Sequence, residues 1–142
     1  MTRRLLLSVI CALSVAACSR SDPYASLTGP TTGSAPYSVT DLRVGTGDAA
    51  VAGRPVVVNY TGWLYSDTAA ENKGTTFDSG TNTRFQLGTL IQGWNLGIPG
   101  MRVGGLRRIV VPPELGYGAA GSPPRIPRNA TLLFEIELVS VP

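Results

Sequence analysis

The chain has 142 residues with 12 basic and nine acidic side chains, 43% hydrophobic residues, two cysteines and no histidine. Its net charge of +3 is spread among interspersed charges of both signs, so there is no basic stripe of the kind that binds a nucleic-acid backbone, and we expect no nucleic-acid partner. Without histidine, and with so few cysteines, a zinc site of the usual ligands cannot be assembled. We expect neither a metal nor a cofactor.

The first 17 residues have the pattern of an export signal. Arg3 and Arg4 give it a positive start, and an apolar stretch too short to span a bilayer continues to Ala17. Residues 15–18, Val-Ala-Ala-Cys, resemble the bacterial lipobox, which implies cleavage before Cys18 and lipidation of that residue. The alternative is an ordinary secretory cleavage near Ala17 that leaves Cys18 free. In either case one cysteine remains, so no disulfide within the chain is expected.

The next segment, residues 18–37, is rich in Ser, Thr, Pro, Gly and Ala and predicts a flexible tether. Residues 38–142 suffice for one compact domain with a single core. We therefore divide the chain into a signal (1–17), a lipidated cysteine with a tether (18–37) and a folded domain (38–142).

Strand patterns dominate the domain. In chain order, we expect strands at 38–44, 55–64, 106–111 and 131–141, a polar loop at 65–76, and short strand pieces at Phe77 and 84–87. Apolar alternation places Val56, Val58 and Tyr60 on one face, and in the last strand Leu132, Phe134, Ile136 and Leu138.

One short helix is expected over residues 92–101. Its propensity is poor because it contains Gly93, Gly97 and Pro99, so only packing could hold it. The side chains expected to pack are Trp94, Leu96, Ile98 and Met101. A twisted antiparallel sheet wrapped around one short helix satisfies all these faces, which makes the fold class α+β.

A long loop precedes the last strand. Tyr117 stands between two glycines at its start, and glycine and proline residues fix its path from 121 to 127. A stiff loop with a tyrosine at its root, beside a strand that carries Phe134 inward, is one way to build an aromatic pocket. The alternative is a surface hairpin with a packed tyrosine.

Six further motifs precede this loop. They are Val-Val-Asn-Tyr-Thr-Gly-Trp-Leu at 57–64, Phe-Asp-Ser-Gly at 77–80, Phe-Gln-Leu-Gly at 85–88, Leu-Ile-Gln-Gly-Trp at 90–94, Gly-Ile-Pro-Gly-Met-Arg-Val-Gly-Gly at 97–105 and Arg-Ile-Val-Val-Pro at 108–112. In this order, and with the loop and the Ala-Thr-Leu-Leu-Phe strand at 130–134, the chain over 38–142 resembles the FKBP-type peptidyl-prolyl cis-trans isomerases. The resemblance implies an FKBP-like fold and the rotation of Xaa-Pro peptide bonds.

The resemblance also implies roles for particular residues. The catalytic set would be Tyr60, Phe77, Asp78, Trp94, Tyr117 and Phe134. Trp94 would be the pocket floor under the proline ring, Asp78 a polar orienter, and the Tyr117 hydroxyl a donor to a ligand carbonyl. The substrate-binding set would be Leu90, Ile91, with its backbone N–H as donor, and Ile126.

The partners implied are proline-containing polypeptides, macrolides of the tacrolimus type and, through the lipid on Cys18, a membrane. We expect a monomer in the bacterial envelope that faces the periplasm and assists folding of exported proteins. The residue after Cys18 is Ser19 and not the aspartate that retains some lipoproteins in the inner membrane, so the outer membrane is favoured.

Other interpretations stay open. Trp94 and Phe134 could be plain core, Asp78 could cap a turn, and Tyr117 could be the packed foot of its loop. As a whole, the domain could be a peptide-binding or chaperone module without turnover, or a structural envelope lipoprotein.

Departures from the family pattern bear on this choice. The segment between Asp78 and Phe85 is short, Thr83 replaces an aromatic wall residue, and no arginine is placed to pair with Asp78 in the usual way, although Arg84 is close. The turn at 88–91 is two residues short, and Ser122 and Arg125 occupy loop positions that are often bulkier or apolar. We expect a pocket that is more open on one side.

Overall fold

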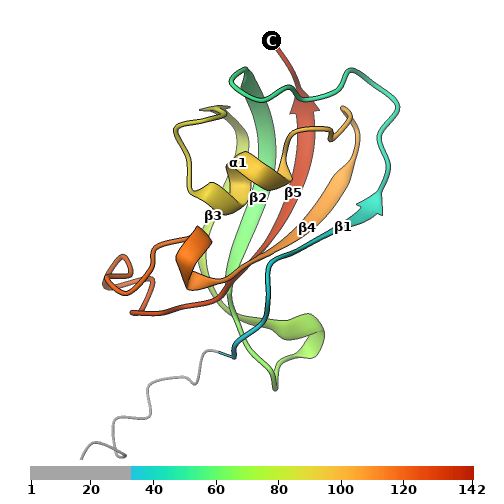
Figure 1. Ribbon diagram of the computed structural model, residues 1–142. Coiled ribbons are helices and arrows are strands. Elements are labelled where there is room, and N and C mark those ends of the chain that lie inside the picture. The colour runs from blue at the N-terminus through green and yellow to red at the C-terminus, as the bar shows by residue number, and fades with distance from the viewer. Residues whose placement is uncertain (1–32) are drawn as a thin grey trace, which may run out of the picture.

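The computed structural model describes residues 33–142, which form a five-stranded antiparallel sheet and one short helix (Figure 1). In chain order the elements are β1 (Ser38–Arg43), β2 (Pro55–Tyr65), β3 (Lys73–Gln86), α1 (Gln92–Gly97), β4 (Leu106–Val111) and β5 (Leu132–Ser140). Two single 3-10 turns lie at Ala70–Asn72 and Pro113–Leu115. The strand order is β1-β4-β5-β2-β3, so the last strand in sequence lies at the centre. The predicted fold class is confirmed.

The core lies between the sheet and α1, as the alternation in β2 and β5 predicts. Val56 and Val58 are fully buried in β2, and the inward residues of β5 are fully buried except Phe134, which is 4% exposed. The opposite face of the sheet carries charges. Arg108 and Lys73 both reach the Glu135 carboxylate, at 2.6 and 3.0 Å, so neighbouring strands are also paired on their outer face.

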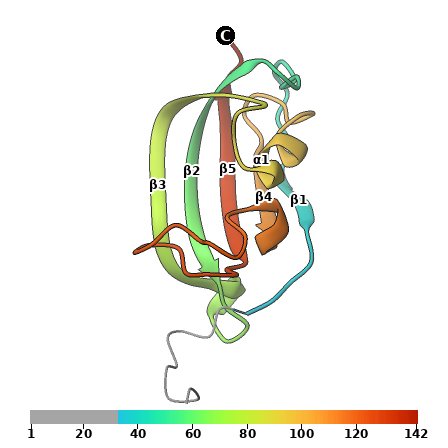
Figure 2. The ribbon, with the colours of Figure 1, turned by 60° about the vertical axis from the view of Figure 1, so that its left-hand side comes forward.

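Helix α1 lies against β4 (Figure 2). A Cβ atom on Gly93 would come within 2.6 Å of a Val111 methyl, and one on Gly97 within 2.5 Å of the Ile109 Cδ1. The two glycines are four residues apart and share one face of the helix, so they allow an approach that larger residues would prevent. This explains why a sequence with poor helix propensity forms a helix here.

The helix is shorter than predicted. It ends at Gly97 rather than at residue 101, and Leu96 is 53% exposed instead of packed. Trp94, Ile98 and Met101 are buried as expected. The predicted packing of Leu96 is wrong because six residues make less than two turns, and only one side of so short a helix faces the sheet.

The region between β2 and α1 also differs from the prediction. The expected loop at 65–76 and the two separate strand pieces are replaced by one 14-residue strand, β3, which begins at Lys73. β3 is an edge strand with a single buried residue, Phe77, so its sequence shows no apolar alternation. Asn82, with φ of 49°, marks an irregularity in its path.

The packed domain begins earlier than residue 38. Gly33 is buried and donates its backbone N–H to the Tyr65 carbonyl at 3.0 Å, and the Tyr37 hydroxyl donates to the Gly93 carbonyl at 3.1 Å. The end of the predicted tether therefore contacts the domain. The predicted signal (1–17) and Cys18 lie outside the described residues. Within residues 33–142, α1 is the one α-helix, and it is far too short to cross a bilayer.

Candidate functional site

A small pocket of about 110 Å³ opens on the helix side of the sheet. Its lining comes from β2, β3, the turn before α1, α1 itself, the loop after β4, and β5: Tyr60, Phe77, Asp78, Phe85, Leu90, Ile91, Trp94, Tyr117 and Phe134. One water needs roughly 10–15 Å³ of such volume, so the pocket admits a small ring but no large side chain. The structure thus brings together eight of the nine residues named from the sequence.

Trp94 lies at the base of this pocket and is 4% exposed. Three aromatic rings meet it nearly edge to face, with centroid distances of 5.2 Å for Tyr60, 5.3 Å for Phe85 and 5.2 Å for Phe134. This is the geometry that aromatic pairs prefer. The indole N–H is buried and has no hydrogen-bond partner among residues 33–142. Such an unpaired buried donor typically costs about 1–3 kcal/mol.

One wall of the pocket depends on a glycine. Phe77 and Phe134 pack edge to face at 5.5 Å, next to Gly62 of β2. A Cβ atom on Gly62 would lie 2.7 Å from the Phe77 Cζ and 2.9 Å from the Phe134 Cε1. The Tyr-Thr-Gly motif therefore ends in glycine because these two rings occupy the space above it.

The polar side of the pocket is an ordered pair. The Tyr60 hydroxyl donates to Asp78 Oδ2 at 2.9 Å, and the Ser79 backbone N–H donates to Asp78 Oδ1 at 2.9 Å. Burial, and then the hydrogen bond to Asp78 and its charge, raise the pKa of Tyr60 to about 12. Tyr60 therefore stays protonated at neutral pH, and Asp78 both orients that ring and caps the backbone at Ser79.

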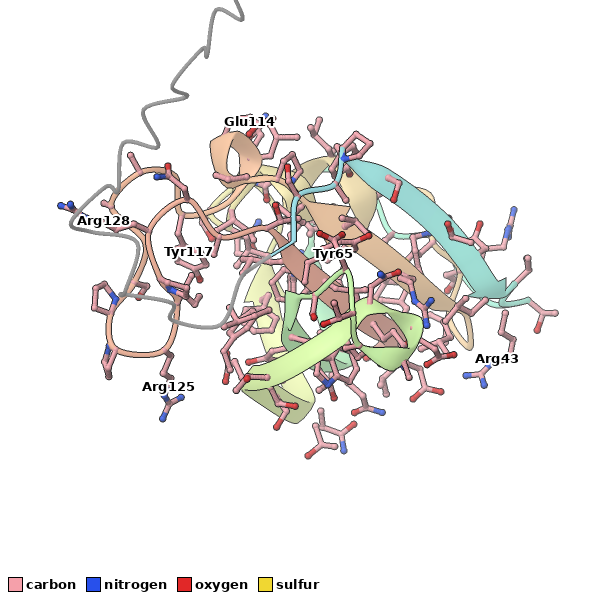
Figure 3. The ribbon with its side chains drawn as sticks, turned by 90° about the horizontal axis from the view of Figure 1, so that it is seen from below. Arg43, Tyr65, Glu114, Tyr117, Arg125 and Arg128 are labelled. Atoms are coloured by element: carbon pink, nitrogen blue, oxygen red, sulfur yellow. The ribbon has the colours of Figure 1, made fainter. Side chains whose placement is uncertain are left out.

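Two donors at the pocket are uncommitted. Tyr117, labelled in Figure 3, is 41% exposed, and its hydroxyl forms no hydrogen bond within residues 33–142. Burial, and then the negative charge of Asp78, raise the pKa of Tyr117, which keeps its proton available for donation. The backbone N–H of Ile91, just before α1, is likewise unused by the part of the chain that the structure describes.

The short turn that presents Leu90 and Ile91 is held by a residue that the sequence analysis did not assign to the site. Asn95 accepts a hydrogen bond from the Gly88 N–H at 2.8 Å and donates its amide to the Leu90 carbonyl at 2.8 Å. One side chain from α1 thus closes the turn from inside. The sequence signal that could have indicated this role was the presence of an asparagine, Asn95, within a segment of poor helix propensity.

Phe85 is the other missed residue. It meets both Tyr60 and Trp94 edge to face and is part of the pocket lining. It pairs with the buried Val56 across β2 and β3, and a prediction of that register from sequence would have placed it inward. Ile126, by contrast, is buried at 4% exposure and does not line the pocket. Arg84 forms no ion pair with Asp78 or with any other described residue.

The chemistry available here is that of a shaped apolar recess. Within residues 33–142 no three Cys, Asp or Glu side chains gather as metal ligands would. The pocket offers two hydrogen-bond donors, a paired carboxylate and aromatic walls. It suits the binding and orientation of a small ring with adjacent carbonyls better than the making or breaking of a covalent bond.

Comparison with known proteins agrees with this geometry. The model of a family described as FKBP-type peptidyl-prolyl cis-trans isomerase matches residues 47–139. The chain is 47% identical over 109 residues to the 46 kDa FK506-binding nuclear protein of Spodoptera frugiperda, which covers 73% of the chain and 25% of that protein. It is 45% identical over 109 residues to an FK506-binding protein of Neisseria meningitidis serogroup A, which covers 72% of the chain and 94% of that protein.

Solved structures give the same picture. A peptidyl-prolyl cis-trans isomerase from Pseudomonas syringae pv. tomato superposes with a TM-score of 0.65 at 35% identity and covers 74% of both chains. FkpA from Escherichia coli superposes with a TM-score of 0.63 at 38% identity, over 74% of this chain and 47% of that chain.

Proposed function

Because the chain belongs to the FKBP-type peptidyl-prolyl cis-trans isomerases, we propose that it accelerates rotation of Xaa-Pro bonds in exported polypeptides within a bacterial envelope. The observation that carries the proposal is the pocket: five aromatic side chains enclose a space of about 110 Å³, with the free Tyr117 hydroxyl beside it. A proline ring with its neighbouring carbonyls is the peptide group that matches this size and polarity.

The reaction needs no nucleophile. Rotation about the amide bond meets a barrier of about 18–20 kcal/mol because it breaks the amide resonance, and in free peptides it takes tens to hundreds of seconds. A catalyst therefore has to bind the twisted amide better than the planar one. A twisted amide has a less polarised carbonyl, so an apolar surrounding favours it over the planar form.

Each part of the pocket has a role in this mechanism. The proline ring lies on the face of Trp94, between Tyr60 and Phe134. The Ile91 N–H and the Tyr117 hydroxyl donate to the carbonyls that flank the rotating bond and hold them still. Asp78 keeps Tyr60 in place through the 2.9 Å hydrogen bond. No proton leaves any group during the rotation.

The test is a protease-coupled isomerisation assay on a short Xaa-Pro peptide with the purified Cys18→Ser protein, which lacks the proposed lipidation site. Tyr117→Phe should lower kcat/KM about two- to tenfold, the range expected for one lost hydrogen bond. Tyr65→Phe is the matched control because Tyr65 lies at the end of β2, outside the pocket. If the folded protein gives no rate above background, the enzyme proposal fails and a peptide-binding module without turnover becomes the better explanation.

We place the protein in the envelope, attached by lipid on Cys18 and facing the periplasm, with the outer membrane favoured. The support is the Val-Ala-Ala-Cys sequence at 15–18 and the apolar segment before it. A single acyl chain binds membranes only marginally, whereas two or more bind firmly, so the lipidated form should resist extraction with salt. Cys18→Ser should move the protein to the soluble fraction and leave its isomerase activity unchanged. A Cys18→Ser protein that still sediments with membranes would contradict the anchor.

Macrolides of the FK506 type are the proposed second class of ligand. Relatives are named for binding FK506, and the pocket keeps the aromatic lining that such a ligand would share with proline. Competition of the macrolide with a proline peptide, followed by the isomerisation rate, tests this separately from turnover.

A further inference from the structure

A second groove, outside the aromatic pocket, runs along the free edge of β3. Five consecutive residues of β3, Thr75 to Ser79, form one wall, and Pro124 and Arg125 of the loop before β5 form the other. Successive side chains of a strand point to opposite faces, so five residues in a row can line one groove only along the edge of the strand. β3 is the edge strand of the sheet, and Figure 2 shows the loop beside its lower half.

The groove is continuous with the aromatic pocket. Phe77 and Asp78 line both. A polypeptide whose proline occupies the pocket therefore has its flanking residues at the entrance of the groove. The free edge of a strand presents unpaired N–H and C=O groups, and these recognise an extended chain by adding it to the sheet.

Of the two charged residues that line the groove, Asp78 already has hydrogen-bond partners and Arg125 has none among the described residues. The carboxylate of Asp78 accepts hydrogen bonds from the Tyr60 hydroxyl and from the Ser79 N–H. Arg125 is exposed, points away from the loop (Figure 3), and forms no ion pair or hydrogen bond within residues 33–142. Its five N–H donors are therefore free, in an arrangement that matches a carboxylate. Arg128, three residues along the same loop, is also exposed and without an ion pair among the described residues.

We propose that this groove binds the residues flanking the proline as an extended segment, and that Arg125 selects substrates with an acidic side chain there. The proposal rests on the proposed function, because it names the substrate class of the same site. Arg125 is a specificity-determining residue in this scheme and touches none of the atoms that rotate.

The experiment uses peptides that contain one Xaa-Pro bond and carry Glu, Gln or Lys in turn at each position from three before to three after the proline. The readout is the ratio of kcat/KM for the Glu and Lys peptides, in which any uniform loss of activity cancels. At low salt we expect a ratio of about two to five at one or two adjacent positions, which is the range for exposed ion pairs. The ratio should approach one as salt screens the pair.

Arg125→Glu should reverse the preference at the same positions, so that the Lys peptides become the better substrates. Arg84→Glu is the matched control. It makes the same change of charge at another exposed arginine, but Arg84 lies near the far end of β3 and lines neither the groove nor the aromatic pocket. The control should leave the ratio as it is. A ratio near one at every position, or an equal effect of both substitutions, would overturn the proposal.

Failure of catalysis would not hide the answer. If the protein isomerises none of the peptides, the proposed function fails, and binding of the same peptides is measured by the backbone amide NMR shifts of Thr75 to Ser79. Glu peptides that shift these amides at lower concentration than Lys peptides, in a manner that Arg125→Glu reverses, support the groove. Shifts confined to other parts of the domain, or equal for both peptides, refute it.

Discussion

Replacement of Trp94 separates its role in the pocket from its role in the core. The side chain is 4% exposed and meets three rings edge to face, so Trp94→Ala removes a large buried volume and should lower the free energy of unfolding by about 3–5 kcal/mol. In Trp94→Leu, a branched apolar side chain refills much of the space, and both variants remove the unpaired indole N–H. We expect Trp94→Leu to cost only about 1–2 kcal/mol, since large-to-small changes that keep apolar volume cost less.

Although Trp94→Leu should cost little stability, it should have a clear effect on activity. Leucine offers no flat face to a proline ring, so Trp94→Leu should weaken binding of a proline peptide and lower kcat/KM in molecules that remain folded. Ile98→Ala is the control, because Ile98 is fully buried just after α1 but does not line the pocket. It should cost about 2–5 kcal/mol and leave kcat/KM of the folded fraction unchanged.

The measurements are urea denaturation followed by circular dichroism, and the protease-coupled assay at a temperature where every variant is folded. A Trp94→Leu protein with unchanged kcat/KM would mean that Trp94 is only a core residue, and the assignment of this pocket as the proline site would fall. A large loss of activity in Ile98→Ala at full folding would show instead that the assay reports stability.

Four further outcomes are expected. Gly62→Ala should lower the free energy of unfolding by about 1–3 kcal/mol and raise KM, because the added methyl overlaps the rings of Phe77 and Phe134. An unchanged free energy of unfolding would show that these rings can move aside. Asn95→Ala removes two hydrogen bonds from the turn at 88–91 and should raise KM more than it lowers kcat, which steady-state kinetics would reveal. The isomerisation rate should be flat between about pH 6 and 8, because the chain has no histidine and the pKa values of Tyr60 and Tyr117 are raised; a limb near neutrality in kcat/KM would contradict this. Burial alone would raise the pKa of Glu135, but hydrogen bonds from Arg108 and Lys73 outweigh burial and lower that pKa. The ionised Glu135 therefore contributes fully to stability above the ordinary pKa of 4.5, and this contribution is lost as the pH falls through the lower pKa of the folded state. Glu135→Gln should therefore flatten the fall of Tm with pH in the acid range, and an unchanged slope in calorimetry would refute this.

Where sequence reasoning succeeded, one strong signal was present. The central strands β2 and β5 alternate because one face is buried, and Pro112 marks the end of β4, so all three strands were predicted with bounds close to those observed. The edge strand β3 is largely exposed and has a single buried residue, so its sequence shows no apolar alternation. We therefore predicted a loop and two short strand pieces in its place. Leu96 was misplaced for a related reason, since periodicity cannot show how short a helix is.

The candidate site shows the same division. Five aromatic residues were found because the family resemblance assigns them roles. Phe85 opens one of the motifs but received no role there, and Asn95 lies just outside the motif at 90–94; their places depend on strand register and on a local turn. Ile126 was expected at the border of the pocket; it is buried in the core cluster that also holds Trp94 and Phe134 and does not line the pocket, because the loop returns its side chain to the core. Positions set by the path of a loop cannot be derived from alternation.

The central place of β5 has a consequence for the way the molecule is made. A chain that emerges from its N-terminal side delivers β1 to β4 first, yet β4 and β2 have no direct partnership and both pair with β5. Until residues 132–140 arrive, two strand edges stay open and Phe134 is missing from the pocket. Because most of its pairings join distant parts of the sequence, the domain should close late and cooperatively. An isomerase domain built in this way should have no partially active precursor, because Phe134 of the pocket arrives with the last strand.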